Sequence, residues 1–471
     1  MKLFDTKVQY LKYRVLKHVA EYAMKDQLID IYRDIPHLII PGKKPNFRCC
    51  VYKERAIIGE RIHLALGGKE DNPLMVEVIE EACDECPVGG LEVTAACRGC
   101  IAHRCVESCP KDAITFDHEH KAVIDKEKCI ECGRCQKVCP YNAIIKFERP
   151  CEKACHVNAI AMDEDKTAVI DASKCIECGA CVYQCPFGAI SDKSQILDVV
   201  NLFKEKSFDE PYKMYAIVAP SIASQFSYAS LEQVIAGLKL MGFDDVVEAA
   251  LGADYAAMLE AHELAEKKEL TSSCCPSFVK YVHTAYPKLS KHVSHNPSPM
   301  LIVADFIKSL DETAKVVFIG PCIAKKREAL NTNVDAVLTF EELQALIDSF
   351  KIDLASLQGK MLDNASFYGR IFARTGGLTE SIRHVIKSEN IDFDFKPVVA
   401  NGIKEAKTAL MKMQVGRLDG NFIEGMACEG GCIGGPCCLS HGPKDLKQVD
   451  AYGRLAHEKT IKEAIKVFNY K

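Results

Sequence analysis

Closely spaced cysteines constrain the fold of this chain more than any other feature of its sequence. One run reads Cys129-x2-Cys132-x2-Cys135-x3-Cys139 and is followed directly by Pro140. A second run, Cys97-x2-Cys100-x4-Cys105-x3-Cys109-Pro110, has two extra residues around His103. Disulfides and structural zinc are the alternatives, but the triple spacing followed by proline speaks against both. Thiolates at this spacing suit cubane iron–sulfur clusters.

The two runs resemble those of the two-cluster bacterial ferredoxins. In such folds the fourth cysteine of each run ligates the other cluster. The resemblance therefore implies two cubanes: one held by Cys129, Cys132, Cys135 and Cys109, and one held by Cys97, Cys100, Cys105 and Cys139. His103 is predicted to be a loop residue, because four thiols already satisfy each cluster.

Part of this unit recurs 46 residues later: the segment 121–125 returns at 167–171, and Cys139 returns as Cys185. The repeat predicts a third cubane on Cys155, Cys175, Cys178 and Cys181. It leaves only Cys151 and Cys185 for a fourth, because the shift places Ala143 and Lys146 where a Cys-x2-Cys pair is needed. We hypothesise that Cys83 and Cys86 fold back to fill this gap. The alternative is that this pair is idle and the fourth site is empty.

The second half of the chain has a different pattern. From Met214, short apolar strands such as 214–218 and 315–319 alternate with helical stretches at 253–268, 276–286, 340–350 and 402–413. Such alternation predicts an α/β domain with parallel sheets. Sites in these domains form where strands end, so chemistry is expected in the loops 219–221 and 320–322.

Three loops in this half carry five thiols: Cys274, Cys275, Cys322, Cys428 and Cys432. They resemble the three signature motifs of the FeFe-hydrogenases, T-S-C-C-P, P-C-x-x-K-x-x-E and E-x-M-x-C-x-x-G-C. The second and third motifs match at every fixed position, whereas the first has Ser272 in place of threonine. Three motifs in the right order are far more specific than one.

The resemblance implies an H-cluster, which is a 4Fe-4S cubane joined to a di-iron unit with CO, cyanide and dithiolate ligands. By motif position, Cys275, Cys322, Cys428 and Cys432 would hold the cubane, and Cys432 would bridge to the di-iron unit. Lys325 and Ser221 would donate to cyanide, and Met426 would form an apolar wall. The alternatives are a plain cubane and, for Lys325, an ordinary surface run with Lys326 and Arg327.

The resemblance also implies a proton path. Cys274 would be its terminal carrier, Glu260 and Glu263 would lie on one helix face, and the Ser294 hydroxyl would link them. The alternative is that both glutamates are simply solvated. Glu328 is expected to be either a salt-bridge partner or a further relay member.

As an activity, the resemblance implies reversible oxidation of H2 to protons and electrons, with a ferredoxin-type electron carrier and a di-iron maturation machinery as partners. Departures at Gly320, Met300, Ser277, Phe278 and the pair Cys437-Cys438 resemble the group B branch. Two alternatives stay open: a low-turnover H2 sensor on the same site, and an iron–sulfur assembly or scaffold protein without a di-iron unit.

The sequence predicts five regions: an N-terminal helical segment (1–80) with one long amphipathic helix, a tandem ferredoxin-like domain (81–192), a linker (193–212), the catalytic domain (213–440) and a C-terminal tail (441–471). A net charge of −5 gives no reason to expect nucleic acid or an anionic membrane. The first residues lack an apolar signal core, and no apolar run reaches membrane-spanning length, so a cytoplasmic location is expected. Cys49 and Cys50 have no assigned role.

Overall fold

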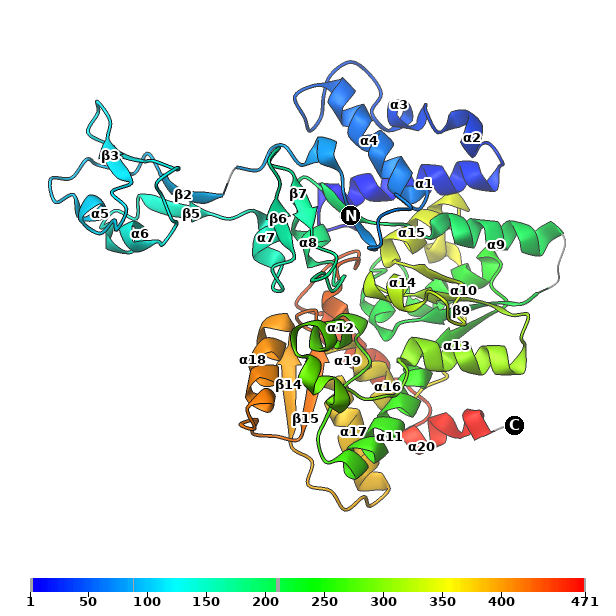
Figure 1. Ribbon diagram of the computed structural model, residues 1–471. Helices are drawn as coiled ribbons and strands as arrows, with labels where there is room; N and C mark the ends of the chain where they lie inside the picture. Colours follow the sequence, from blue (N-terminus) through cyan, green and yellow to red (C-terminus); the bar gives the residue numbers. More distant parts are fainter. Residues whose placement is uncertain (1–2, 88, 209–211, 470–471) are drawn as a thin grey trace.

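The computed structural model describes residues 3–87, 89–208 and 212–469 (Figure 1). Four helices precede the cysteine-rich region: α1 (Lys7–Met24), α2 (Leu28–Ile31), α3 (Ile35–Ile39) and α4 (Val51–Ala65). The long predicted helix is α1, which begins with a capping box between Thr6 and Gln9. The sequence analysis missed α2 to α4. The helices α2 and α3 have only four and five residues and depend on packing against α1, whereas α4 is a 15-residue helix that was overlooked.

Two ferredoxin-like units follow, each built on short antiparallel ribbons. In the first unit β2 (Gly90–Val93) pairs with β5 (Ile144–Phe147), and β3 (Ile114–Phe116) pairs with β4 (Ala122–Ile124). In the second, β1 (Val76–Val78) pairs with β8 (Ile190–Asp192), and β6 (Ile160–Met162) pairs with β7 (Ala168–Ile170). Their helices are α5 (Arg104–Glu107), α6 (Arg134–Val138), α7 (Pro150–Ala154) and α8 (Ala180–Gln184).

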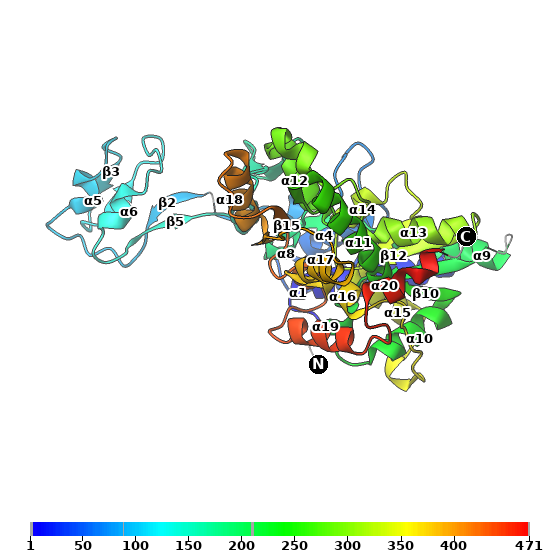
Figure 2. The same cartoon turned by 90° about the horizontal axis from the view of Figure 1, so that it is seen from below.

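The two units are nested rather than consecutive. Strand β1 belongs to the second unit, yet it precedes the whole of the first unit in the chain. The first unit is therefore an insertion between β1 and β6. It projects from the body of the molecule on the β2–β5 ribbon, whereas the second unit lies against the body (Figures 1 and 2).

Two parallel sheets organise the remaining chain, which confirms the predicted α/β class. One has the order β10 (Asp245–Glu248), β9 (Met214–Val218), β12 (Lys315–Ile319), β13 (Ala336–Leu338). The other has the order β11 (Leu270–Thr271), β15 (Phe422–Met426), β14 (Pro397–Asn401). The longer helices around them are α10 (Leu231–Met241), α11 (Ala249–Lys267), α12 (Pro276–Ala285), α13 (Pro299–Leu310), α15 (Phe340–Ser349), α17 (Gly377–Ser388) and α18 (Ile403–Gln414). The short ones are α14 (Ala324–Glu328) and α16 (Phe367–Arg370).

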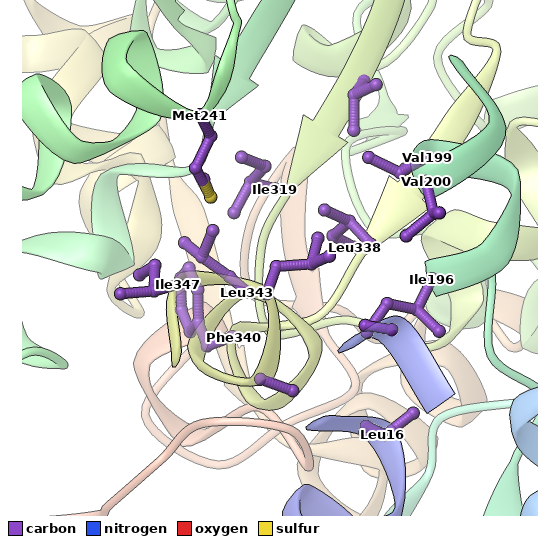
Figure 3. Packing of buried hydrophobic residues seen from close by; sticks show 14 of the residues in the cluster. Leu16, Ile196, Val199, Val200, Met241, Ile319, Leu338, Phe340, Leu343 and Ile347 are labelled. Atoms are coloured by element: carbon purple, nitrogen blue, oxygen red, sulfur yellow. The ribbon is translucent and has the colours of Figure 1, made fainter. Parts of the chain in front are cut away.

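The segment predicted to be a linker is a core element instead. Residues 196–208 form helix α9 (Ile196–Phe208), which packs beside β13. Ile196, Val199 and Val200 have no exposed surface, and they face Leu338 from the sheet and Leu16 from α1 (Figure 3). The N-terminal helices therefore share one hydrophobic core with the first sheet. Residues 209–211 lie outside the described residues.

The segment predicted to be a C-terminal tail also packs on the body. It contains α19 (Asp445–Arg454) and α20 (Ile461–Ala464), and these contact α16 and α11 respectively. Val449 is fully buried, and the Tyr452 hydroxyl donates to Glu248 at 2.6 Å. Among the helices in the described ranges, none combines the length and the apolarity that a membrane crossing requires.

Candidate metal centre

Four cysteines from three separate loops meet where the strands of the two sheets end. Cys275 caps α12 after β11, Cys322 follows β12, Cys428 follows β15, and Cys432 begins the short helix η6 (Cys432–Gly434). Burial raises the pKa of the Cys322 thiol to about 12, and Cys275 and Cys432 nearby add to the effect. Burial likewise raises the pKa of Cys428, with Cys322 and Cys275 contributing. Neighbouring thiols at such a density suit a soft metal cluster, which would stabilise them as thiolates.

The loop between the last two thiols depends on glycine at one position in particular. Gly431 has φ of +88°, and a Cβ atom there would lie 2.7 Å from the backbone nitrogen of Thr375. No other residue fits this conformation and this space without strain. The same motif is anchored by Glu424, whose buried carboxylate accepts hydrogen bonds from the backbone of Gly376 at 2.7 Å and Thr379 at 2.8 Å. These contacts hold the loop against the start of α17.

Lys325 is not part of a surface run. Its side chain is 11% exposed, and the neighbouring Lys326 side chain has no exposed surface. The Lys325 ammonium group donates to the Glu328 carboxylate and lies 3.5 Å from the carbonyl oxygen of Cys274. Burial acts to lower the pKa of Lys325, but Glu328 and the thiols of Cys322 and Cys274 outweigh it, so this pKa lies above its ordinary value. A buried cation therefore stands beside the thiols.

Ser221 and Met426 are the two remaining residues that were predicted to line the site of the four thiols. Ser221 belongs to η2 (Pro220–Ser224), which contacts the η6 helix that begins at Cys432. The Ser221 hydroxyl is buried and has no hydrogen-bond partner among the residues that the structure describes. A buried hydroxyl without a partner is costly, so such a group points to a polar ligand. Met426 is 3% exposed at the end of β15.

The predicted proton-path residues fall into two hydrogen-bonded groups. Ser294 Oγ donates to Glu263 at 2.7 Å, as the linking role requires, but it makes no hydrogen bond to Glu260. Glu260 is 1% exposed and instead accepts from the Ser273 backbone N–H at 3.1 Å. Burial raises the pKa of Glu260 to about 7, a value that suits proton exchange. The Glu260 carboxylate also acts on the adjacent Cys274 thiol, whose pKa burial raises well above its usual value.

The sequence analysis missed two residues that lie between these groups. Ser273 Oγ donates to the Asn296 carbonyl oxygen at 2.7 Å, and the Asn296 side chain donates to Glu263 at 2.8 Å. Ser273 occupies a fixed serine position of the first motif, which was the available signal. Asn296 carries no sequence signal of its own. Glu328 accepts from Lys325 and from Ser298, so it is a salt-bridge partner of Lys325.

In each ferredoxin-like unit, four cysteines that were predicted to share a cluster line one cavity. A small cavity in the first unit is lined by Cys109, Cys129, Cys132 and Cys135. Cys105 in the same unit lies beside Cys100 and Cys139, and Cys97 packs in the same apolar cluster. A matching cavity in the second unit is lined by Cys155, Cys175, Cys178 and Cys181. His103 stacks on Phe116 at a centroid distance of 4.1 Å.

Cys83 precedes the inserted first unit in the chain, but it lies in the second unit. In the first unit the backbone N–H of Ala122 donates to Cys97 Sγ at 3.5 Å. At the repeat-related position, 46 residues later, Ala168 donates to Cys83 Sγ at 3.4 Å. Cys83 therefore occupies the geometric position of Cys97. Burial raises the pKa of Cys151 to about 12, and the nearby thiols of Cys185 and Cys83 contribute. Cys86 lies beside the same two thiols, so all four come together.

The cavity site of the second unit adjoins the loops that carry Cys275 and Cys428. The Cys178 thiol lies near both of these thiols. A cleft of about 740 Å³ between the second unit and the α/β domain is lined by residues that include Cys178 and Cys428. The two groups of thiols are thus neighbours across this interface.

The residues at which this chain departs from the hydrogenase motifs are tightly packed, and at Gly320 the packing explains the departure. A Cβ at Gly320 would lie 2.7 Å from the Phe318 ring, so a larger residue does not fit there. Met300 is 1% exposed in the core, and Phe278 has no exposed surface. Cys437 and Cys438 are also fully buried; Cys438 Sγ donates to the carbonyl oxygen of Ile433 at 3.4 Å.

Comparison with known proteins agrees with this geometry. Residues 212–436 match the family model of the iron-only hydrogenase large subunit, C-terminal domain, and residues 96–143 and 121–186 match 4Fe-4S dicluster domains. The chain is 31% identical over 402 residues to iron hydrogenase 1 of Clostridium pasteurianum, covering 72% of this chain and 69% of that protein. It is 30% identical over 381 residues to the periplasmic Fe hydrogenase large subunit of Nitratidesulfovibrio vulgaris, covering 68% and 86%.

Two further similarities bear on fold and role. A cytosolic Fe-S cluster assembly factor of Eremothecium gossypii is 31% identical over 167 residues, covering 32% of this chain and 37% of that protein. A solved FeFe-hydrogenase structure superposes with a TM-score of 0.50 at 21% sequence identity, over 58% of this chain and 93% of that one. The fold is therefore that of the FeFe-hydrogenases, with iron–sulfur units added before it.

Proposed function

The chain belongs to the iron-only hydrogenase family, and we propose that it is an FeFe-hydrogenase that interconverts H2 with protons and electrons. One observation carries this proposal. Three further groups lie near Cys432 or its helix: the Cys274 thiol, the buried Lys325 ammonium, and the buried Ser221 hydroxyl, which has no hydrogen-bond partner among the described residues. A plain electron-transfer cubane needs none of these three groups.

The residues present fit an H-cluster. Cys275, Cys322, Cys428 and Cys432 would hold its cubane, with Cys432 bridging to the di-iron unit, because one thiolate can bind two irons at once. Lys325 and the Ser221 hydroxyl would donate hydrogen bonds to its cyanide ligands, and Met426 would exclude water from one side. When bound, this cofactor supplies the redox chemistry of hydrogen.

The protein itself supplies a route for protons. Cys274 would exchange them at the cofactor, and Glu260 stands next to it with a pKa raised to about 7. Ser273 and Asn296 lie between Glu260 and the Glu263–Ser294 pair: the Ser273 backbone N–H donates to Glu260, the Ser273 hydroxyl to the Asn296 carbonyl oxygen, and the Asn296 side chain to Glu263. These two residues hold the carboxylates in position. The groups of this route that can carry a proton are the Cys274 thiol, the two carboxylates and the Ser294 hydroxyl.

The assembly or scaffold function remains the second candidate, favoured by the similarity to a cluster assembly factor. The intact Cys274, Lys325 and Met426 favour the enzyme instead.

We further propose a ferredoxin-type electron carrier and a di-iron maturation machinery as partners. We also propose a cytoplasmic location. None of the 25 cysteines in the described part forms a disulfide, which suits a reducing compartment. The motif departures support the group B branch.

Infrared spectroscopy tests the proposed function directly. After maturation with a di-iron cofactor, the protein should show absorption bands of bound CO and cyanide, which lie where protein does not absorb, and should evolve H2 with a low-potential electron donor. A matured protein that holds its cubanes but shows no such bands would favour the assembly or scaffold function. Bands with very slow turnover would favour the sensor.

The iron content tests the number of clusters. We propose four ferredoxin-type cubanes, the fourth held by Cys83, Cys86, Cys151 and Cys185. Protein made without the di-iron maturation machinery should then contain about twenty iron atoms, four in each of five cubanes. Changing Cys83 and Cys86 together to serine should remove about four of them.

Cys49 and Cys50, which are adjacent in the sequence, provide the control for the iron content. Cys49 is exposed and Cys50 partly exposed, and neither is a proposed ligand. Changing both to serine should leave the iron content unchanged. A wild-type value near roughly sixteen, unaffected by the Cys83 and Cys86 substitutions, would remove the fourth cluster from the proposal.

A further inference from the structure

A dipeptide inside the cluster-binding loops has opposite surroundings in the two ferredoxin-like units. Ile130-Glu131 lies between Cys129 and Cys132 in the first unit, and Ile176-Glu177 lies 46 residues later, between Cys175 and Cys178. In the first unit both residues are exposed, Ile130 at 57%. In the second unit both are 2% exposed. The local loop is the same, because both glutamates have φ near +55°. The difference therefore arises from what covers the second loop.

The Glu177 carboxylate is fully occupied by donors from three other parts of the chain. Its Oε1 accepts from the backbone N–H of Met75 at 2.8 Å. Its Oε2 accepts from Lys280 Nζ at 3.0 Å, and Arg327 Nε lies 3.3 Å from both oxygens. A buried carboxylate is tolerated when it is paired and hydrogen-bonded in this way. One anion thus joins two cations.

Both cations belong to helices that follow closely on a proposed ligand of the catalytic cubane: Cys275 directly precedes α12, and Cys322 lies two residues before α14. Lys280 lies on α12, five residues after Cys275, and Arg327 lies on α14, five residues after Cys322. Helices α12 and α14 contact each other beside the second unit (Figure 1). Apolar contacts reinforce the junction, because Ile176 packs in one cluster with Phe278, Tyr281 and Val282 of α12.

We propose that Glu177 is the residue that couples the neighbouring ferredoxin-type cluster to the catalytic cubane, by fixing their relative position and by setting the potential of that cluster. The cluster concerned is the one on Cys155, Cys175, Cys178 and Cys181, so this inference rests on the proposed iron–sulfur sites. Electron transfer slows steeply with distance, so a clamp between the two ligand-bearing structures fixes the rate of the last transfer. Glu177 is a positioning residue in this role.

The charge of Glu177 has a predictable effect on potential. The potential of an iron–sulfur cluster depends on nearby charge and solvent exposure. Reduction adds a negative charge to the cluster, so a buried carboxylate beside it opposes reduction. Removing that carboxylate leaves Lys280 and Arg327 with no anion between them, which favours reduction. In the first unit Glu131 is exposed, so water and salt screen its charge.

The test compares Glu177→Gln with Glu131→Gln, which are the same change at repeat-related positions. Midpoint potentials of the clusters are measured by EPR-monitored redox titration of protein made without the di-iron machinery, so the readout does not depend on turnover. Glu177→Gln should shift the potential of one cluster upward. Glu131→Gln should leave every potential where it is in the wild type.

Lys280→Met should shift the potential of the same cluster downward, because it removes a cation and leaves the carboxylate. If Glu177→Gln fails to retain that cluster, the direction of the shift in Lys280→Met is by itself the test of the inference. Unchanged potentials in both variants, or shifts in the same direction, would overturn the inference. Failure of the proposed function would look different: the shifts would occur, but the matured protein would lack CO and cyanide bands.

Discussion

Cys274→Ser should fold, bind its clusters and show CO and cyanide bands, yet lose most of its hydrogen turnover. Serine keeps approximately the size of cysteine, but its hydroxyl is a far weaker acid than a thiol. A positioned proton carrier is worth about 10²–10⁴-fold in rate, so turnover should fall by that order. The measurement is H2 evolution and oxidation per mole of matured protein, alongside its infrared spectrum.

The adjacent substitution Cys275→Ser is the matched control, and its expected phenotype is the reverse. Cys275 is one of the four mutually close thiols, so serine in its place should lose or alter the cubane itself. If Cys274→Ser strips the cluster while Cys275→Ser keeps it, the assignment of the two cysteines must be exchanged. Full turnover in Cys274→Ser would mean that protons take another route, and the path through Glu260, Ser294 and Glu263 would lose its terminus.

Lys325→Asn should sharply weaken retention of the di-iron unit while leaving the cubanes in place. The reason is the loss of a charge-assisted hydrogen bond to an anionic ligand, a stronger interaction than its neutral counterpart. Asparagine can still donate, but it is shorter and uncharged. The cyanide bands should weaken or shift in the matured variant, and activity should fall in proportion to the di-iron unit that is lost.

Lys326→Asn distinguishes this effect from general damage to α14. The Lys326 ammonium donates to Asp192 at 2.8 Å and Glu342 at 2.9 Å, in a fully buried network. Breaking such a network costs about 3–5 kcal/mol of stability, so Lys326→Asn should lower the melting temperature. Molecules that remain folded should keep unchanged cyanide bands. Unchanged bands and full activity in Lys325→Asn would instead place Lys325 outside the cofactor site.

The sequence by itself determined the features that depend on local spacing. The intervals between the first three cysteines of a run decide that these thiols can reach one cubane, because the span of a few residues is fixed by backbone geometry. The fourth cysteine of each cluster came from the resemblance to ferredoxins, extended to the second unit by the 46-residue repeat, and two of the predicted groups line cavities in the structure. The strands at 214–218 and 315–319 could equally be predicted from the sequence, since buried parallel strands are continuous apolar runs.

Only the tertiary structure decided which polar groups are buried. The sequence left open whether Lys325 serves the site or belongs to a surface run with Lys326, and the structure decides this because helix α14 is covered by the second ferredoxin-like unit and by α15. The two dipeptides Ile130-Glu131 and Ile176-Glu177 are identical in sequence, and only the packing of α12, α14 and Met75 against the second loop buries the second pair. Helix α9 was predicted to be a linker, because only the tertiary structure shows that its apolar residues pack against β13 and α1. Each of these depends on contacts between segments far apart in the chain, and local periodicity carries no information about such contacts.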